Sequence, residues 1–324
     1  MTTIPPIEPG KGRRILVVGA CGFLGRSVVR AFSRAGFEVR GLLRDPVKQA
    51  RVREDGGIPV IGDILDVPSL QRASTGCWGV IHLAANPPAD EDRFRVRVEG
   101  TNNLVGALRR NGVARLVIGS GYWVYRGQPD LIHEDSPVEP RGEVEINFDA
   151  ERTGLAANSR GGLEVLVVRP GMVYGDESWF RGLADQIQAG EFRAVAGGAN
   201  RWSFVERRDA GTAFQAVLES GTVGEVYNVV DGHPAPLREF ADFVAAELGR
   251  PPPGTVTLEE AANEMGEVVA RHLAADRPTS DRKLRSLGWR AQTSSYRDGV
   301  PVLLREMFPE VATTLHGGAS PVSE

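Results

Sequence analysis

The stretch Arg14-Ile-Leu-Val-Val18 runs directly into Gly19-Ala-Cys-Gly22-Phe-Leu-Gly25, and an amphipathic segment over 23–35 follows. A buried strand, a turn with three glycines spaced three residues apart and the start of a helix are the parts of a dinucleotide-binding site. The glycines allow a tight turn, a close approach to a pyrophosphate and close packing of the helix. Phosphate oxygens would accept hydrogen bonds from the N–H groups at the helix N-terminus. This context favours a bound nucleotide over a tight turn without a ligand.

Outward from this turn, short apolar runs alternate with helical stretches. The expected strands are 15–18, 39–43, 58–61, 80–83, 116–118, 165–168 and 226–229. The expected helices are 23–35, 68–74, 96–110, 148–159, 178–190, 237–248, 258–274 and 280–287. Strands without polar alternation indicate burial on both faces. The pattern therefore predicts an α/β fold of the Rossmann type, with a doubly wound parallel sheet between layers of helices.

The change of pattern after Gly175 suggests two domains. We expect a dinucleotide-binding domain over 13–175, which 201–230 rejoins through one more strand. A smaller, helix-rich substrate domain is expected from 176–200 and 231–310. The two ends, 1–12 and 311–324, are poor in apolar residues and are expected to be disordered tails.

Composition limits the function classes. The 324 residues carry a net charge of −4 and are 41% hydrophobic, so no basic surface for nucleic acid or an anionic membrane is expected. No run approaches the ~18 apolar residues of a membrane span. The only cysteines, Cys21 and Cys77, suggest neither a disulfide framework nor a metal site. These features fit a cytoplasmic enzyme of small-molecule metabolism without a metal.

Several further motifs follow the glycine turn in a fixed order. They are Gly62-Asp-Ile-Leu-Asp66, His82-Leu-Ala-Ala85, Glu99-Gly-Thr-Asn-Asn-Leu104, Val124-Tyr125, Arg169-Pro-Gly-Met-Val-Tyr-Gly175, Trp202-Ser-Phe-Val205, Tyr227-Asn-Val229 and Leu287-Gly-Trp289. In this order the chain resembles the extended short-chain dehydrogenases/reductases, the NAD-dependent epimerase/dehydratase family, from about Arg14 to Glu306. The resemblance implies a nicotinamide cofactor, a small-molecule substrate and, by analogy, a homodimer paired through the helices at 96–110 and 148–159.

The resemblance also implies which residues contact the cofactor. The glycine turn with Phe23 and Leu24 would hold the pyrophosphate, and Asp63 with Ile64 would border the adenine. The ribose and nicotinamide would lie against Leu83, Ala84, Ala85 and Pro170. Each position also has a plain structural interpretation: Asp63 as a turn residue, and the small residues as packing at a strand end.

Arg44 bears on the choice between NAD and NADP. In NAD-selective relatives an acidic residue ends the second strand and binds the ribose 2′-hydroxyl. Leu43 stands there in this chain, and the arginine beside it is suited to a 2′-phosphate. NADP is therefore expected ahead of NAD, with a solvated arginine at the strand end as the alternative.

The chain departs from the family at the catalytic positions. Relatives use a serine or threonine, a tyrosine and a lysine four residues after the tyrosine. Aligned on Val124-Tyr125 and Gly154, these positions are Gly121, Asn147 and Glu151. Asn147 has no titratable proton, so it cannot act as a general acid or base. Glu151 reverses the charge of the lysine and would raise the pKa of a neighbouring phenol.

Two residues are candidates to replace the lost groups. Tyr122 follows the vacant serine position and offers the nearest phenol, although an aromatic packing role beside Trp123 is as plausible. Glu151 is a candidate general base for lyase, isomerase or hydration chemistry if burial raises its pKa. The acidic residues around it, such as Glu145 and Asp149, are expected merely to favour the helix N-terminus.

Three functions are consistent with this pattern. The first is an NADP(H)-binding enzyme with a rebuilt site: a reductase with relocated proton delivery, or a non-redox isomerase or lyase. The second is a catalytically silent NADP-sensing or partner-binding protein. The third is a nucleotide-sugar epimerase or dehydratase, which is disfavoured because Trp202 stands where such relatives carry an arginine for the diphosphate.

Overall fold

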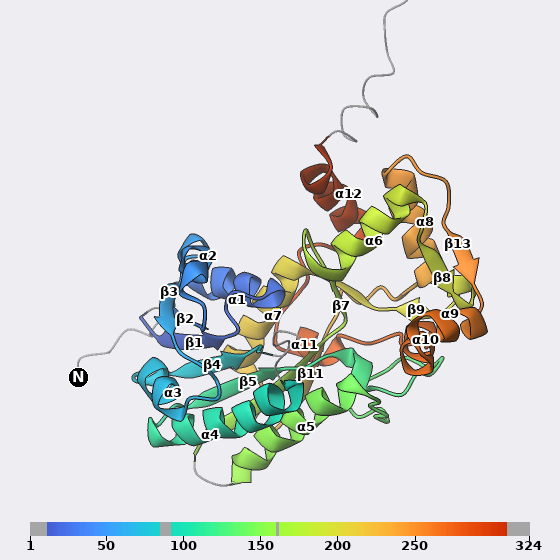
Figure 1. The fold of residues 1–324 in the computed structure, drawn as a ribbon. Helices are drawn as coiled ribbons and strands as arrows, with labels where there is room; N and C mark the ends of the chain where they lie inside the picture. Colours follow the sequence, from blue (N-terminus) through green and yellow to red (C-terminus); the bar gives the residue numbers. More distant parts are fainter. Residues whose placement is uncertain (1–11, 85–91, 160–161, 310–324) are drawn as a thin grey trace, which may run out of the picture.

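The computed structural model describes residues 12–84, 92–159 and 162–309, and a seven-stranded parallel sheet forms its centre (Figure 1). The strand order is β11-β6-β5-β4-β1-β2-β3. These strands are β1 (Arg14–Val18), β2 (Glu38–Leu43), β3 (Ile58–Ile61), β4 (Gly79–His82), β5 (Arg115–Gly119), β6 (Glu164–Pro170) and β11 (Val226–Val229). All seven expected strands are present, and the Rossmann-type α/β fold is confirmed. The expected tails fall almost entirely on residues outside the described ranges.

Helices cover both faces of the sheet, because alternate residues of its strands are apolar on both sides. Ile15 and Val17 of β1 pack in one cluster with α1 (Phe23–Arg34) and α7 (Arg207–Ser220). Leu16 and Val18 pack in the opposite cluster with α3 (Val67–Ser74) and α4 (Gly100–Arg110). Figure 1 shows α4 and its neighbour α5 (Glu143–Leu155) side by side below the sheet.

A second core lies beyond the carboxyl ends of the strands and is rich in aromatic residues. Phe204 and Phe240 stack with their ring centroids 4.3 Å apart, and Tyr296 meets the Phe240 ring edge-on at 5.1 Å. The helices of this core are α6 (Ser178–Ala189), α8 (Leu237–Glu247) and α12 (Tyr296–Met307). Its short strands are β7 (Met172–Tyr174), β9 (Arg201–Trp202), β10 (Phe204–Glu206) and β12 (Ala235–Pro236). The paired strands β8 (Arg193–Val195) and β13 (Gly254–Val256) contribute to a separate small apolar cluster.

Several helix boundaries differ from the expectation. The helix expected over 148–159 begins five residues earlier, as α5, and ends in a 3₁₀ turn over Ala156–Ser159. The helix expected over 258–274 is two helices, α9 (Leu258–Met265) and α10 (Glu267–Ala274), because Gly266 between them has a φ of 88° that breaks the helix. Three α-helices, namely α2 (Gln49–Glu54), α7 and α12, were not expected. The remaining short helix is α11 (Arg282–Ser286).

One buried ion pair attaches α5 to the sheet. Arg169 at the end of β6 donates from Nη2 to Glu151 Oε2 at 2.6 Å and from Nε to Glu151 Oε1 at 3.1 Å. Both side chains are almost completely buried, at 5% and 1% exposure. The Arg169 guanidinium also lies 4.8 Å from the ring of Tyr125. Since neither charge reaches water, each depends on the other for its solvation.

We therefore expect Glu151→Gln to destabilise the protein by about 3–5 kcal/mol, because it leaves the Arg169 charge buried without a counter-ion. Urea unfolding would measure the change. The matched control is Asp149→Asn on the same helix, whose ion pair with Arg152 is exposed at 3.7 Å and is worth at most about 0.5 kcal/mol. Equal effects of the two substitutions would contradict a buried, essential pair.

Candidate cofactor and catalytic site

The glycine turn leaves room for a phosphate group. Gly19 has a φ of 89°, and the N–H of Gly22 donates to its carbonyl at 3.0 Å. A Cβ on Gly25 would lie 2.0 Å from the Gly19 oxygen, so no larger residue fits there. The helix start has neither a side-chain cap nor an acidic residue in its first turn. The N–H groups of Phe23 and Leu24 precede the first α-helical hydrogen bond and are suited to phosphate oxygens.

Two of the predicted adenosine contacts lie together at the ends of β2 and β3. Arg44 Nη1 is 3.7 Å from Asp63 Oδ2, and both side chains are partly exposed. Asp63 Oδ1 also accepts a hydrogen bond from the N–H of Leu65 at 2.8 Å, which makes Asp63 a turn residue as well. The pair therefore offers a cation and a carboxylate at one edge of the expected cofactor path.

The other predicted contacts border the same ends of the strands. Ile64 is buried against Gly100, whereas Leu83 directly follows β4 and its N–H donates to the carbonyl of Val18. Ala84 is half-buried, and Pro170 is the last residue of β6. The predicted contact at Ala85 lies outside the described residues.

The three positions predicted to match the family's catalytic serine, tyrosine and lysine lie on two elements. Gly121 directly precedes the 3₁₀ turn Tyr122–Val124, with extended backbone, and Asn147 and Glu151 lie one turn apart on α5. A Cβ on Gly121 would meet only ordinary contacts, at 3.8 Å from Trp123 and 4.0 Å from Pro170. Packing therefore does not require glycine at this position.

Tyr122 is enclosed in the aromatic core. Its side chain has no exposed surface, and its hydroxyl has no hydrogen-bond partner among the described residues. Burial raises the pKa of the phenol far above its ordinary value. A phenol in this position holds its proton firmly, which limits its use as a proton donor.

Arg97 is a functional candidate that the sequence analysis missed. It lies in the π-helical turn Arg95–Glu99 that precedes α4, and only 1% of its surface is exposed. Its guanidinium donates from Nε to Asn147 Oδ1 at 3.1 Å and from Nη1 to the Ala84 carbonyl at 3.2 Å. Nη2 donates to the carbonyl of Gly119. Arg97 thus joins the ends of β4 and β5 to the asparagine at the tyrosine position.

Helical spacing offered a signal for Arg97. It shares one helix face with Thr101, Leu104 and Leu108, at steps of four, three and four residues, and all three are buried. A charged residue on such a face must find partners inside the protein. Burial lowers the pKa of Arg97 to about 10, so it remains a cation at neutral pH.

The contact with Arg97 fixes the orientation of Asn147. A guanidinium can only donate hydrogen bonds, so the oxygen of the amide must face it. The Nδ2 group of Asn147, with two N–H donors, then faces away from Arg97. Glu151 is already occupied by Arg169. The site therefore offers an oriented hydrogen-bond donor supported by a buried cation, at the position predicted to match the family's phenol.

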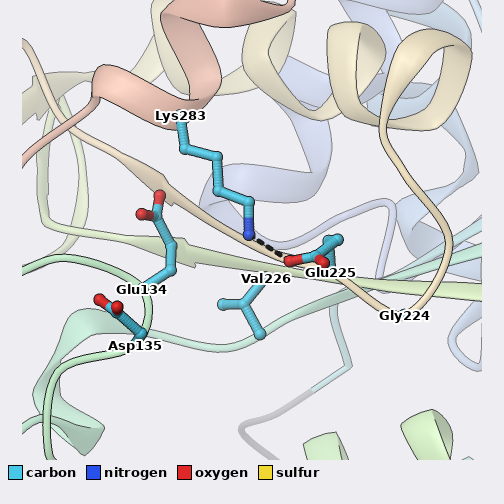
Figure 2. A pocket seen from close by; sticks show the side chains of 6 residues that line it. All are labelled: Glu134, Asp135, Gly224, Glu225, Val226 and Lys283. Atoms are coloured by element: carbon cyan, nitrogen blue, oxygen red, sulfur yellow. Dashed lines mark hydrogen bonds and ion pairs between the residues drawn. The ribbon is translucent and has the colours of Figure 1, made fainter.

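Two surface hollows lie outside this constellation. One, of about 350 Å³, borders the start of β11 and contains Glu134 and the ion pair of Lys283 with Glu225 at 2.5 Å (Figure 2). None of the predicted site residues lines it. The second, of about 510 Å³, lies between the segment 126–141 and α10. Within the described ranges, no metal-ligand cluster occurs and no helix has the length and apolar character needed to span a bilayer.

Known sequences identify the relatives of this chain. The model of the NAD-dependent epimerase/dehydratase family matches residues 15–230. The chain is 33% identical over 307 residues to a 3-diazoavenalumate denitrifying reductase from Streptomyces sp, a match that covers 89% of this chain and 99% of the relative. It is 30% identical to a 4-hydroxy-2-methyl-3-oxo-4-farnesyl-3,4-dihydroquinoline-1-oxide ketoreductase from Stigmatella aurantiaca, over 80% of this chain and 81% of that one.

Solved structures share the fold. A dTDP-glucose 4,6-dehydratase from Streptomyces venezuelae with bound NAD has a TM-score of 0.77 and 24% identity, and the match covers 92% of this chain and 97% of that one. A human epimerase family protein with NADPH has a TM-score of 0.74 and 21% identity, over 90% and 98% of the two chains. The chain belongs to the NAD-dependent epimerase/dehydratase family of extended short-chain dehydrogenases/reductases.

Proposed function

We propose that this protein is an NADP(H)-dependent reductase of a small molecule, in which Asn147 polarises the reacting group of the substrate by hydrogen-bond donation. The observation that carries the proposal is the hydrogen bond from the buried Arg97 to Asn147, because it leaves the amide N–H groups as the donors. Most enzymes of this family rely on a phenol at the same position. Here the oriented amide of Asn147, hydrogen-bonded to the Arg97 cation, would provide the electrostatic part of that role.

The proposed reaction does not require a side chain of the protein to donate a proton. A bound nicotinamide would supply a hydride to an electrophilic atom of the substrate. In a ketone, the electron pair displaced by the hydride moves to the carbonyl oxygen, and Asn147 Nδ2 would stabilise the negative charge that develops there. Arg97 stabilises the same negative charge by polarising the Asn147 amide through their hydrogen bond. It also holds the orientation of that amide. The proton that completes the product comes from solvent.

The names of two relatives fit a substrate of this kind. One is a ketoreductase and the other a denitrifying reductase of a diazo compound. A nucleotide sugar is a weaker candidate. Arg201, the arginine nearest the position that grips a diphosphate in such relatives, is occupied by Asp276, with Nη2 2.6 Å from Oδ2.

A catalytically silent NADP-binding protein is the second candidate. The observation in its favour is that both titratable candidates are withdrawn from solvent: Tyr122 without a partner, and Glu151 in its pair with Arg169. The two candidates differ in one measurement. The reductase should transfer deuterium from 4-deuterated NADPH to members of a panel of aryl ketones and aryl diazonium salts, whereas the silent protein should bind NADPH and transfer none.

For a substrate identified in that panel, we expect Asn147→Ala to lower kcat by about 100-fold, because removal of one preorganised donor typically has this effect. The Kd of NADPH, measured by fluorescence, should stay within about twofold, which separates loss of chemistry from loss of cofactor. Asp149→Asn, on the exposed part of the same helix, is the matched control and should leave kcat unchanged. Full activity of Asn147→Ala would refute the proposed role.

The pH profile of kcat/KM should also distinguish this site from a tyrosine-dependent one. Asn147 does not titrate, and the pKa of Arg97 is about 10. Activity depends on the protonated guanidinium, so it should be constant from about pH 6 to 9 and be lost as the pH rises through 10. Arg97→Lys should move this loss to lower pH, because burial lowers the pKa of an ammonium more readily. A rise in activity on the alkaline side would instead indicate a general base.

The preference for NADP is proposed from Arg44, which lies beside Asp63 at the expected 2′-position of the ribose. Arg44→Ala should raise the Kd of NADPH by about tenfold or more and change that of NADH by less than about threefold, because only the former carries a 2′-phosphate. Fluorescence titration would measure both. Arg51→Ala, on the nearby helix α2, is the control for general loss of positive charge. Equal losses for both cofactors would contradict the assignment.

A further inference from the structure

The hollow of about 510 Å³ between the segment 126–141 and α10 is lined mainly by charged side chains. Its volume lies in the range of small-molecule sites. The ionisable residues of its wall are Arg126, Glu139, Arg141, Glu267, Arg271 and Arg277, together with His272. Four arginines face two carboxylates, so the wall carries an excess of two positive charges.

The excess charge belongs to two particular arginines. Arg141 pairs with Glu139, and Arg271 pairs with Glu267 at 2.8 Å. Across residues 12–84, 92–159 and 162–309, neither Arg126 nor Arg277 forms an ion pair with a carboxylate. Arg277 donates from Nε and Nη1 only to backbone carbonyls, at 3.1 and 2.9 Å. It is also 96% buried, so its charge lacks both water and a counter-ion.

His272 adds an unpaired polar atom to the same wall. Burial lowers the pKa of its imidazole to about 4, so the ring is neutral at pH 7. Its Nε2 is buried and, in the described part of the chain, has no hydrogen-bond partner. Because Nε2 is enclosed within the wall, the groups that favour an anion with oxygen acceptors in the hollow are the two guanidinium groups without a paired carboxylate.

The hollow adjoins the candidate catalytic site through Trp123. The Trp123 ring stacks on His272 with centroids 4.5 Å apart and lies 5.1 Å from the Arg277 guanidinium. The Cδ1 atom at the edge of the same ring lies 3.8 Å from the position of a Cβ on Gly121. One aromatic side chain therefore contacts both Gly121 and two residues of the basic wall.

Helix α5 gives a second measure of this proximity. Val268, which lines the hollow, lies 3.4 Å from the position of a Cβ on Gly142, the residue that precedes α5. Asn147 follows Gly142 by five residues, or about 7.5 Å along the helix axis. The wall of the hollow therefore comes within about one and a half helix turns of Asn147 along α5.

We propose that this hollow binds a carboxylate at the far end of the substrate, with Arg126 and Arg277 as its partners. The proposal rests on the proposed reductase function and names the substrate class: an unsaturated or aromatic compound that carries a carboxylate about one helix turn or more from its reducible group. Arg126 and Arg277 are positioning and specificity residues in this scheme and take no part in the chemistry.

The test uses trans-cinnamate as the probe and its neutral amide, cinnamamide, as the matched ligand, titrated calorimetrically into the full chain. Cinnamate should bind at least about fivefold more tightly than cinnamamide, since only the anion can form charge-assisted hydrogen bonds. Arg126→Gln should abolish that preference. Arg126 is exposed and unpaired, so this variant should fold normally, whereas Arg277 supports the backbone and is a poorer target.

A second variant should act in the opposite direction. Glu139→Gln removes a carboxylate and releases Arg141, so it should tighten cinnamate binding by about threefold. Structural damage does not produce such a gain. Arg250→Gln, at an exposed position after α8, is the control and should leave the affinity unchanged. Equal binding of acid and amide, or no response to either wall variant, would overturn the carboxylate site.

The two proposals fail separately. Cinnamate binding requires no turnover, so charge-dependent binding without any deuterium transfer would refute the reductase function and retain the anion site. Deuterium transfer that is insensitive to Arg126→Gln and Glu139→Gln, in KM as well as in kcat, would refute the anion site and retain the reductase.

Discussion

The guanidinium of Arg97 is the interaction on which the candidate site depends. It binds the carbonyls of Ala84 and Gly119, where two neighbouring strands end, and it holds the amide of Asn147. Backbone carbonyls at strand ends would otherwise need water or ligand as donors. The buried Arg97 cation donates hydrogen bonds to both carbonyls and also orients Asn147, the residue predicted at the family's tyrosine position. The geometry of the site therefore comes from the sheet itself, through Arg97, and not from a loop.

The predicted alignment changes the distribution of charges in the site. At the position predicted to match the family's lysine, α5 carries Glu151, which pairs with Arg169 from β6. The positive charge nearest Asn147 now comes from the turn before α4. A carboxylate at 151 without Arg169 would be a buried, unpaired charge, so the two residues have to be explained together. In the same way, Arg97 and Asn147 act as a unit: an asparagine is a useful donor only if its amide cannot rotate.

Much of the fold followed from the sequence, because apolar runs with no polar alternation admit few structures other than a sheet covered on both faces. The contacts around the candidate site could not be predicted in the same way, since they join residues that are far apart in the chain. Arg97 looks like an ordinary charged residue of a helix until its face is known to be buried. The enclosure of Tyr122 likewise depends on the aromatic core that packs over it. The split at Gly266 was missed because a glycine inside a helical pattern is often tolerated.

Two glycines of the chain, Gly25 and Gly121, differ in whether packing leaves space for a Cβ. Gly25 is fixed by sterics, since a Cβ there would lie 2.0 Å from a backbone oxygen, and this residue has been retained. Gly121 is under no such constraint: a Cβ there would lie 3.8 Å or more from its nearest neighbours. Packing around this Cβ therefore does not account for the glycine predicted at the family's serine position. A chain with a sterically demanding cofactor turn and no steric need for glycine at 121 is more consistent with the proposed change of reaction than with accumulated damage. The fixed donor at Asn147 and the basic wall beyond Trp123 are the features that such a reaction would use.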